Sequence, residues 1–403
     1  MADRLIKRLH IINEFYFFRL IFTISELFNI SFFYIFLYTQ TNSLSEVISF
    51  QIVMYLGLMI GFVLGSFLIE EFGYIGNYKL SFLILGINQI FLAFTIGYFN
   101  NLIIVFAMVG GFARGLFWST ANMNKIKEFG TTLRNLLISN IISVTLLMNI
   151  IIPPIVGAYL SFTKDYAFIF LIGGLMLISS VFIPWQYTKN PKSKITKNEF
   201  ITILRNKYFI NYGATLILKH GFEAQIALIF FILPFILIGD EFGVGILATI
   251  VAIFSVFLSI TYRGAKETQI IKLGIIGNAI EAVASTILLI FWGVPGLVIR
   301  GLGTTLSSAM KLSSEDKIES KLREIILKDK LNQSIIELNF LAEIFMFLGR
   351  FSFLLLFLIF SIFIEDIQQV FKIIILLASI WGLMYIPLLS GISSKIRKAY
   401  NEA

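Results

Sequence analysis

Cysteine is absent from the 403-residue chain, and histidine occurs only at His10 and His220. The absence of cysteine excludes disulfides, thiolate metal sites and cysteine nucleophiles. Two histidines leave too few ligands for an ordinary zinc site and too few bases for the usual nucleophilic triads. No phosphate-binding loop of the form Gly-x-x-x-x-Gly-Lys-Ser/Thr occurs either. We therefore expect a protein that is not an enzyme and that holds no metal or other cofactor.

Charged residues are also scarce, at 14%, whereas hydrophobic residues make up 58% of the chain. Soluble domains contain about 25% charged and about 45–50% apolar residues. The apolar residues gather in blocks that exceed the roughly 20 residues needed to cross a bilayer core of about 30 Å. The composition therefore predicts an all-α polytopic membrane protein.

Hydropathy and helix-breaking residues divide the chain into twelve predicted spans. They lie near residues 16–38, 48–69, 78–98, 102–123, 135–160, 166–187, 209–238, 242–262, 273–292, 295–312, 334–363 and 367–391. The first span lacks a small-residue cleavage site, so we do not interpret it as a signal peptide. The basic segment 189–207 separates six spans from six. We expect two six-helix bundles, 1–190 and 209–403, joined by a cytoplasmic linker at 191–208.

The distribution of positive charge predicts the orientation of the spans. If the N-terminus is cytoplasmic, only Lys164 and Lys372 of the 32 Lys and Arg residues fall on outer loops. Basic residues near the ends of these approximate spans count with the adjoining loops, and five lie deep within spans: Arg19, Arg114, Lys219, Arg300 and Arg350. Because basic residues accumulate in cytoplasmic loops, we expect both termini in the cytoplasm. The expected location is the plasma membrane of a prokaryote. The net charge of +8 then reflects topology and does not support nucleic-acid binding.

Two charged segments between spans have the pattern of surface helices. The second part of segment 189–207 can form a short amphipathic helix at the membrane surface. Segment 311–330 has a capping-type start at Ser313 and spaces its apolar residues on one helical face. We expect both to be cytoplasmic surface helices that anchor the topology. A regulatory role is the alternative.

A short sequence occurs once in each half of the chain. Arg114-Gly-Leu and Arg300-Gly-Leu are each followed by small hydroxylic residues and by a lysine eleven positions after the arginine, Lys125 or Lys311. An arginine inside a span costs about 2.5 kcal/mol or more. Repetition of such a costly feature favours a duplicated membrane unit, and a chance match in a biased sequence is the alternative.

Six plus six spans, a basic central segment, cytoplasmic termini and a parallel repeat resemble the major facilitator superfamily of secondary transporters. That family carries the motif small-x-Leu-x-Asp-Arg-x-Gly, followed by basic residues, between spans two and three. The matching positions here are Ser66, Leu68, Glu70 and Gly73, whereas Glu71 replaces the arginine and the basic pair is missing. The resemblance implies the major facilitator fold. It also implies a turn at Gly73 and a gating charge contact between the halves through Glu70.

Span five offers a second resemblance. The sequence from Pro153 and Pro154 to Gly157 and Ala158 is similar to the Gly-Pro-x-x-Gly-Gly ending of a motif associated with exporters in this superfamily. Proline and glycine loosen a helix and permit close approach of a neighbour. The resemblance implies export, and an ordinary helix kink is the alternative.

Spans one, four, seven and ten line the central cavity in that superfamily. The resemblance therefore implies a substrate- and proton-coupling site made of Glu26, Arg114, Glu223 and Arg300, arranged about a pseudo-twofold axis. Burial favours a neutral carboxyl group, while a neighbouring guanidinium favours the ionised form. Such a group can take up and release a proton during transport. Buried salt bridges that only fix helix packing are the alternative.

Four further polar residues within spans are secondary candidates: Lys219, His220, Glu281 and Glu343. Lys219 can extend to the interface, and His220 can relay protons. Local pairing is open for Glu281 with Asn278 and for Glu343 with Arg350. The spacing of Glu343 and Arg350, two turns along one face, favours partners on neighbouring helices over a direct pair.

These observations lead us to expect a proton-coupled secondary transporter that works by alternating access as a monomer in the lipid bilayer. The partial motif of span five and the 43 phenylalanines favour export of a small amphipathic or aromatic compound. The alternative is a lipid-linked oligosaccharide flippase of the multidrug/polysaccharide exporter type, which also has two six-helix halves. The motif at Ser66–Gly73 and the basic central segment favour the facilitator interpretation.

Overall fold

The computed structural model of the chain describes residues 2–127, 131–184, 197–206, 208–225, 228–262, 270–327 and 335–401. These residues are helical almost throughout, and none of them forms a strand. The chain divides into two compact units, Met1–Lys194 and Ile195–Ala403. This division falls inside the linker expected at 191–208, of which the structure describes 197–206 and 208.

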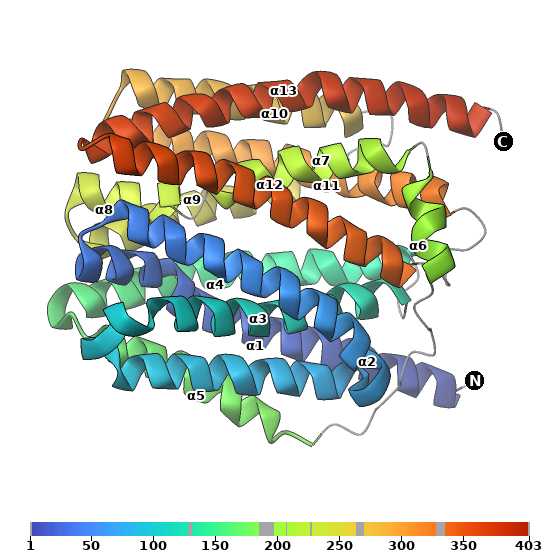
Figure 1. Cartoon of the computed structure of the whole chain (residues 1–403), viewed down its shortest axis with the longest axis horizontal. Helices are drawn as coiled ribbons and strands as arrows, with labels where there is room; N and C mark the ends of the chain where they lie inside the picture. Colours follow the sequence, from blue (N-terminus) through green and yellow to red (C-terminus); the bar gives the residue numbers. More distant parts are fainter. Residues whose placement is uncertain are drawn as a thin grey trace. The chain divides into compact units, whose positions relative to one another are not determined.

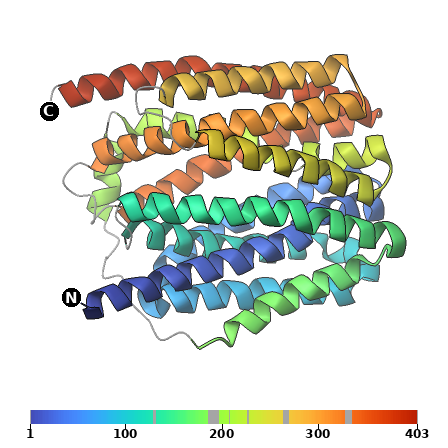
Figure 2. The same cartoon turned by 180° about the vertical axis from the view of Figure 1, so that it is seen from behind.

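The first unit contains five α-helices and one short 3-10 turn (Figures 1 and 2). They are α1 Ala2–Thr41, α2 Leu44–Phe94, η1 Ile96–Tyr98, α3 Phe99–Lys127, α4 Thr131–Thr163 and α5 Tyr166–Val181. Helix α2 packs along α3 and α5, and α1 packs along α4 and α5. The helices of this unit therefore lie side by side, as expected for a bundle that crosses a membrane.

The second unit is built in the same way from helices that lie side by side. It comprises α6 Lys197–Leu204, α7 Phe209–Ala224, the π-helical segment η2 Leu228–Ile232, α8 Leu233–Ile238, α9 Glu241–Tyr262, α10 Ile270–Ile290, α11 Val294–Leu327, α12 Ile335–Phe363 and α13 Ile367–Asn401. Helix α10 packs along α11 and α13, and α7 packs along α12 and α13.

Nine helices in the described part of the chain are long and apolar enough to cross a membrane. The sequence predicts twelve spans, and the difference arises at three places. The 51-residue helix α2 counts once but holds two predicted spans. Helix α5 has 16 residues and is short, and α11 carries Arg300 and several Ser and Thr residues in its apolar half.

Helix α2 is a hairpin that reverses at Gly73. This glycine has φ 68° and ψ 179°, outside the helical range. The side-chain amide of Asn77 donates a hydrogen bond of 3.3 Å to the carbonyl of Gly65, 12 residues earlier. In a straight helix these positions would lie about 18 Å apart. The predicted turn glycine is therefore confirmed, because only glycine adopts this backbone conformation without strain.

The span predicted at 209–238 is kept as one apolar segment long enough to cross a membrane, Phe209–Ile238, but the helix type changes before Pro234. Helix α7 ends at Ala224, and a π-helical segment, Leu228–Ile232, precedes the short α8. Proline has no N–H to donate to the carbonyl four residues earlier, and that carbonyl belongs to Phe230 in the π-helical segment. The α-helical hydrogen-bond pattern is therefore interrupted where the sequence predicts continuity.

The two expected surface helices have different outcomes. Residues 197–204 form the predicted short helix α6, whose Phe200 ring packs edge-on against Phe340 at 5.2 Å and whose Ile203 is buried. The prediction of a separate helix that starts near Ser313 is wrong, because α11 continues from Val294 to Leu327 without a break. No glycine or proline follows Gly303 in this helix, so nothing in its sequence ends it earlier.

Glycines bring α2 and α3 into backbone contact. A Cβ atom at Gly61 would overlap the carbonyl oxygen of Phe112, and one at Gly115 would overlap the carbonyl oxygen of Leu58. Gly57 and Gly111 are enclosed by the partner backbone in the same way. Small residues one turn apart allow membrane helices to approach this closely, and the contact fixes the rotation of α3 about its axis.

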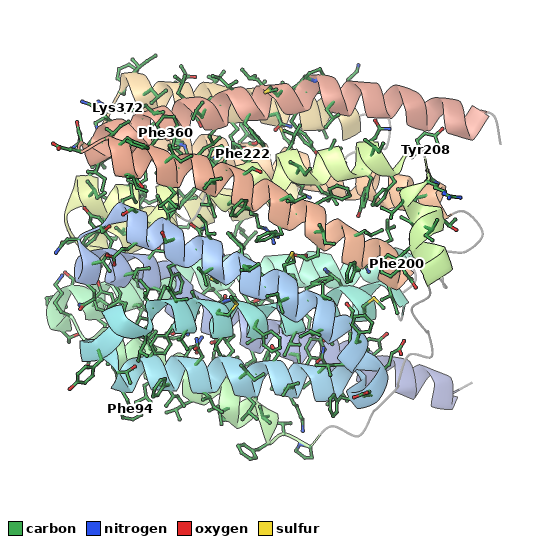
Figure 3. The ribbon with its side chains drawn as sticks, viewed as in Figure 1. Phe94, Phe200, Tyr208, Phe222, Phe360 and Lys372 are labelled. Atoms are coloured by element: carbon green, nitrogen blue, oxygen red, sulfur yellow. The ribbon has the colours of Figure 1, made fainter. Side chains whose placement is uncertain are left out.

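Many large apolar side chains are exposed at the surface, and Phe94 is one of them (Figure 3). Phe94 is 77% exposed, Phe162 89% and Phe363 81%. Soluble monomers rarely expose large contiguous apolar patches. The exposed apolar side chains and the long apolar helices therefore both predict contact with lipid.

We expect Gly61→Val to abolish the folded protein, because the new side chain would force α2 and α3 apart. Overpacking of a well-packed contact typically costs about 1–3 kcal/mol. The fraction of monodisperse protein in size-exclusion chromatography after detergent extraction measures the effect. Gly97→Val is the matched control, because a Cβ atom at Gly97 meets no atom within 4 Å. Equal recovery of both variants would contradict the close contact.

Candidate functional site

Glu26 on α1 and Arg114 on α3 form a two-pronged ion pair. Arg114 Nε lies 2.8 Å from one carboxylate oxygen of Glu26, and Arg114 Nη2 lies 2.9 Å from the other. The side chains are only 12% and 15% exposed. Parallel hydrogen bonds between a guanidinium and a carboxylate are among the strongest that proteins make. The structure thus brings together two residues that lie 88 positions apart in the sequence.

The close contact between α2 and α3 directs Arg114. Arg114 lies on α3 between Gly111 and Gly115. Both glycines lie against the backbone of α2. Because the two glycines fix the rotation of α3, they also fix the direction in which Arg114 leaves the helix. Tyr34 and Tyr55 lie within electrostatic reach of its guanidinium.

Aromatic rings pack beside this pair. The Phe22 ring stacks on Phe117 with centroids 3.7 Å apart and planes 6° from parallel. Trp118 meets Phe22 edge-on at 6.1 Å. The guanidinium of Arg19 on α1 lies over the Trp118 ring, 4.1 Å from its centroid. Arg19 is one of the five basic residues within the predicted spans, and no sequence signal singles it out for the site.

The second unit does not repeat the pairing of the first. Glu223 and Arg300 are the members of the predicted site in this unit. Glu223 Oε2 lies 2.7 Å from Nδ1 of His220 on its own helix, and the Glu223 side chain is 44% exposed. Lys219 and Arg350 also act on Glu223 electrostatically. The local pairing in the second unit therefore differs from that of Glu26 with Arg114, and a central site made of all four residues stays a prediction.

Arg300 is buried and has its charge partner on α10. It is 3% exposed and interacts electrostatically with Glu281, which is also 3% exposed. Glu281 accepts a hydrogen bond of 2.9 Å from Ser307 of α11. Asn278, the expected neighbour of Glu281, donates to the carbonyl of Gly274 at 2.9 Å. Helices α10 and α11 pack along each other, and the interactions of Arg300 and Ser307 with Glu281 join these two helices.

Glu343 and Arg350 on α12 form a direct ion pair of 3.0 Å. The expectation that they seek partners on neighbouring helices is wrong. Seven residues span about 10.5 Å of helix, and both side chains are long enough to close this distance along one face. His220 also acts on Glu343 electrostatically, so charged groups of α7 and α12 form one cluster.

The predicted gating and kink residues lie on helices of the first unit. Glu70 precedes the hairpin turn at Gly73, and its Oε1 is buried without a hydrogen-bond partner among the described residues. Its charge contact with the other half stays a prediction. Pro153 and Pro154 lie inside α4, which is helical through both of them and through Gly157.

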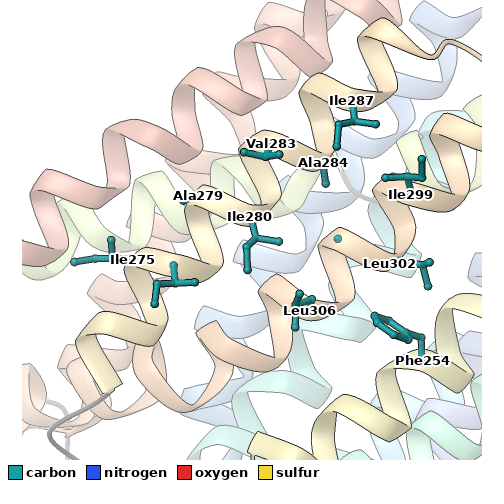
Figure 4. A pocket seen from close by; sticks show the side chains of 12 residues that line it. Phe254, Ile275, Ala279, Ile280, Val283, Ala284, Ile287, Ile299, Leu302 and Leu306 are labelled. Atoms are coloured by element: carbon teal, nitrogen blue, oxygen red, sulfur yellow. The ribbon is translucent and has the colours of Figure 1, made fainter.

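A groove in the second unit lies between α10, α11 and Phe254 of α9 (Figure 4). Its volume is about 520 Å³, and its twelve lining residues are all apolar. The groove can take an apolar group, but it offers nothing to hold a charge. No cluster of three His, Cys, Asp or Glu residues that could hold a metal ion occurs within the described ranges.

Solved structures share this fold over nearly the whole chain. The crystal structure of a D-xylose-proton symporter matches with a TM-score of 0.68 and 14% identity, over 95% of this chain and 97% of that one. An auto-inhibited peptide transporter of the POT family matches with a TM-score of 0.65 and 11% identity, over 95% of this chain and 96% of that one. No family model and no curated protein sequence matches the chain.

Both solved structures are transporters of the major facilitator superfamily. Identities of 14% and 11% show the fold alone. The chain therefore has the major facilitator fold, which confirms the fold inferred from six plus six spans and a basic central segment.

We expect Arg114→Ala to destabilise the protein by about 3–5 kcal/mol, because it leaves the buried Glu26 carboxylate without its partner. Arg114→Lys should lose less, since it keeps the charge but not the planar fork. Unfolding in detergent, followed by tryptophan fluorescence, measures the losses. The double variant Glu26→Gln/Arg114→Gln should recover part of the stability. An Arg114→Ala protein as stable as the parent would show that the pair does not hold α1 on α3.

Proposed function

We propose that this protein, which has the major facilitator fold, is a proton-coupled secondary active transporter. The observation that carries the proposal is the ion pair between Glu26 and Arg114, whose side chains are only 15% and 12% exposed. An ionised carboxylate accepts both guanidinium hydrogen bonds, whereas a protonated one gives up an acceptor site and the charge. Protonation of Glu26 therefore weakens the contact between α1 and α3.

This coupling of protonation to helix contact is what a proton-driven cycle requires. A buried carboxylate that gains and loses a proton changes the free energy of two arrangements of the helices that carry it. Intramembrane acidic residues are rare because they are costly, and their presence marks ion or proton pathways by default. A proton symporter among the structures of the same fold supports the proposal of proton coupling.

We further propose that the transported compound is small and amphipathic or aromatic, and that it is exported. The exporter-like sequence from Pro153 to Gly157 supports the direction. The apolar groove between α9, α10 and α11, about 520 Å³ in volume, has the size of ordinary ligand pockets and supports an apolar part in the compound. The similarity to facilitator structures favours this function over that of an oligosaccharide flippase.

The proposed location is the plasma membrane of a prokaryote, with both termini in the cytoplasm and one chain as the working unit. The excess of Lys and Arg on the loops assigned to the cytoplasm supports this orientation. The proposal includes no cofactor, because the proton gradient supplies the free energy.

The orientation predicts that reporter fusions after residues 195 and 403 both give a cytoplasmic signal. Alkaline phosphatase, active only outside the cytoplasm, and green fluorescent protein, fluorescent only inside, are the paired reporters. A fusion after Lys164, which the prediction places outside, is the matched control and should give the opposite result. Phosphatase activity after residue 195 or 403 would contradict the twelve-span topology.

We expect Glu26→Gln to abolish transport driven by a pH gradient, because glutamine cannot gain or lose the coupling proton. Exchange of substrate between equal pools should be largely retained, since exchange needs no net protonation. Flux in proteoliposomes, with and without a pH gradient, measures both activities. Glu71→Gln is the control, because Glu71 is an exposed carboxylate on the same unit. If Glu26→Gln keeps full gradient-driven flux, the coupling proton binds elsewhere.

A further inference from the structure

Arg19 on α1 is a second cation beside the ion pair of Glu26 and Arg114. Its guanidinium carbon lies 4.1 Å from the centroid of the Trp118 ring and 5.8 Å from that of Phe117. Its Nη1 atom is buried and has no hydrogen-bond partner among the residues that the structure describes. Arg19 therefore differs from Arg114, whose guanidinium donates two hydrogen bonds to one carboxylate.

The charges on this face of α1 and α3 do not balance. Arg19, Glu26 and Arg114 contribute two positive charges and one negative charge. Both oxygens of Glu26 accept hydrogen bonds from Arg114, at 2.8 and 2.9 Å, so the carboxylate acts on Arg19 only through the electrostatic field. Tyr78 is the other group that acts on Arg19 in this way. The described part of this face thus carries one positive charge in excess.

Stacking on Trp118 uses the face of the guanidinium and leaves its edge for hydrogen bonds. An arginine can stack on an aromatic ring and at the same time donate two parallel N–H groups in its own plane. Arg19, Trp118, Glu26 and Arg114 are all partly exposed in the structure. A ligand at the surface of this unit can therefore approach the exposed part of the group, whereas Arg19 Nη1 itself is buried. The indole ring fixes the plane of the guanidinium.

We propose that Arg19 is an anion-binding residue and that the transported compound carries a carboxylate, which the edge of this guanidinium binds. A planar carboxylate offers two oxygens at the spacing of the guanidinium fork. It also supplies the negative charge that this face of α1 and α3 lacks. The inference deepens the proposed function, since it names the chemical class of the substrate at the same group of residues.

The first test uses stability without any ligand. Arg19→Gln should leave the melting temperature of the full-length protein unchanged or raise it, because the variant loses a charge that has no ionic partner. Arg114→Gln should lower it, because Glu26 is left unpaired. If Arg19→Gln lowers the melting temperature as much as Arg114→Gln does, Arg19 is a structural partner of an acidic group and the inference is overturned.

The second test uses probes of one shape and different charge. Benzoate, benzamide and benzamidine are titrated by isothermal calorimetry into the full-length protein in lipid nanodiscs, with phenylphosphonate as a further anion. We expect benzoate to bind at least about tenfold more tightly than benzamide, as one charge-assisted pair would give. Tighter binding of phenylphosphonate than of benzoate would replace the carboxylate by a phosphate-like group and overturn the stated substrate class.

Variants then locate the preference. Arg19→Gln should bind benzoate no better than benzamide, and Arg19→Lys should recover part of the difference. The matched control is Lys372→Gln, because Lys372 is also a cation stacked on a tryptophan, 4.9 Å from the Trp292 ring, in the other unit. A benzoate preference that is missing in the parent, or that survives Arg19→Gln, overturns the inference.

This result is separate from the test of proton coupling. Proton-driven flux without a carboxylate preference would leave the proposed function intact and remove the role of Arg19. A carboxylate preference without proton-driven flux would keep the role of Arg19 and remove the proposed coupling.

Discussion

A charge inside a membrane protein needs a partner, because hydrocarbon cannot solvate it, and the arrangement around the candidate site follows from this constraint. Arg114 meets it with a two-pronged bond to Glu26, which ties α1 to α3. Arg19 has only a partial substitute for such a partner, because its guanidinium stacks on the face of the Trp118 ring. Arg19 is therefore stacked on an aromatic ring without an ion pair among the described residues, whereas Arg114 is held in a closed ion pair with Glu26.

The two units show that a repeated sequence need not give a repeated site. Arg114 and Arg300 begin the same three-residue sequence, yet Arg114 pairs with α1 and Arg300 interacts with Glu281 of α10. The difference follows from the neighbours. Ser307 and Glu281 already meet between α11 and α10, and Glu223 meets His220 on its own helix. Each charge interacts with a partner that local packing offers, and local packing differs between the two units.

Some structural details were predictable because they depend on one residue and its immediate neighbours. Gly73 is an example, since a positive φ at a hairpin turn requires glycine wherever the turn occurs. The direct pair of Glu343 and Arg350 was not predictable in the same way. Spacing of two turns permits the pair but does not select it, because each side chain could also turn toward another helix. The capping pattern at Ser313 predicts a helix start, but it lies inside α11, which continues to Leu327. A capping pattern therefore does not by itself begin a new helix.

The sequence by itself determined the class of the protein, the approximate spans and the linker between two halves. These follow from the free energy of transferring apolar residues into hydrocarbon, which sums along the chain and needs no knowledge of neighbours. Only the tertiary structure decided which charges interact. Glu26 forms an ion pair with Arg114, Glu281 interacts electrostatically with Arg300, and Arg19 Nη1 has no hydrogen-bond partner among the described residues. Those outcomes depend on how each helix is rotated against the next. Contacts such as that of Gly61 with the backbone of Phe112 set the rotation, and they join residues far apart in the sequence.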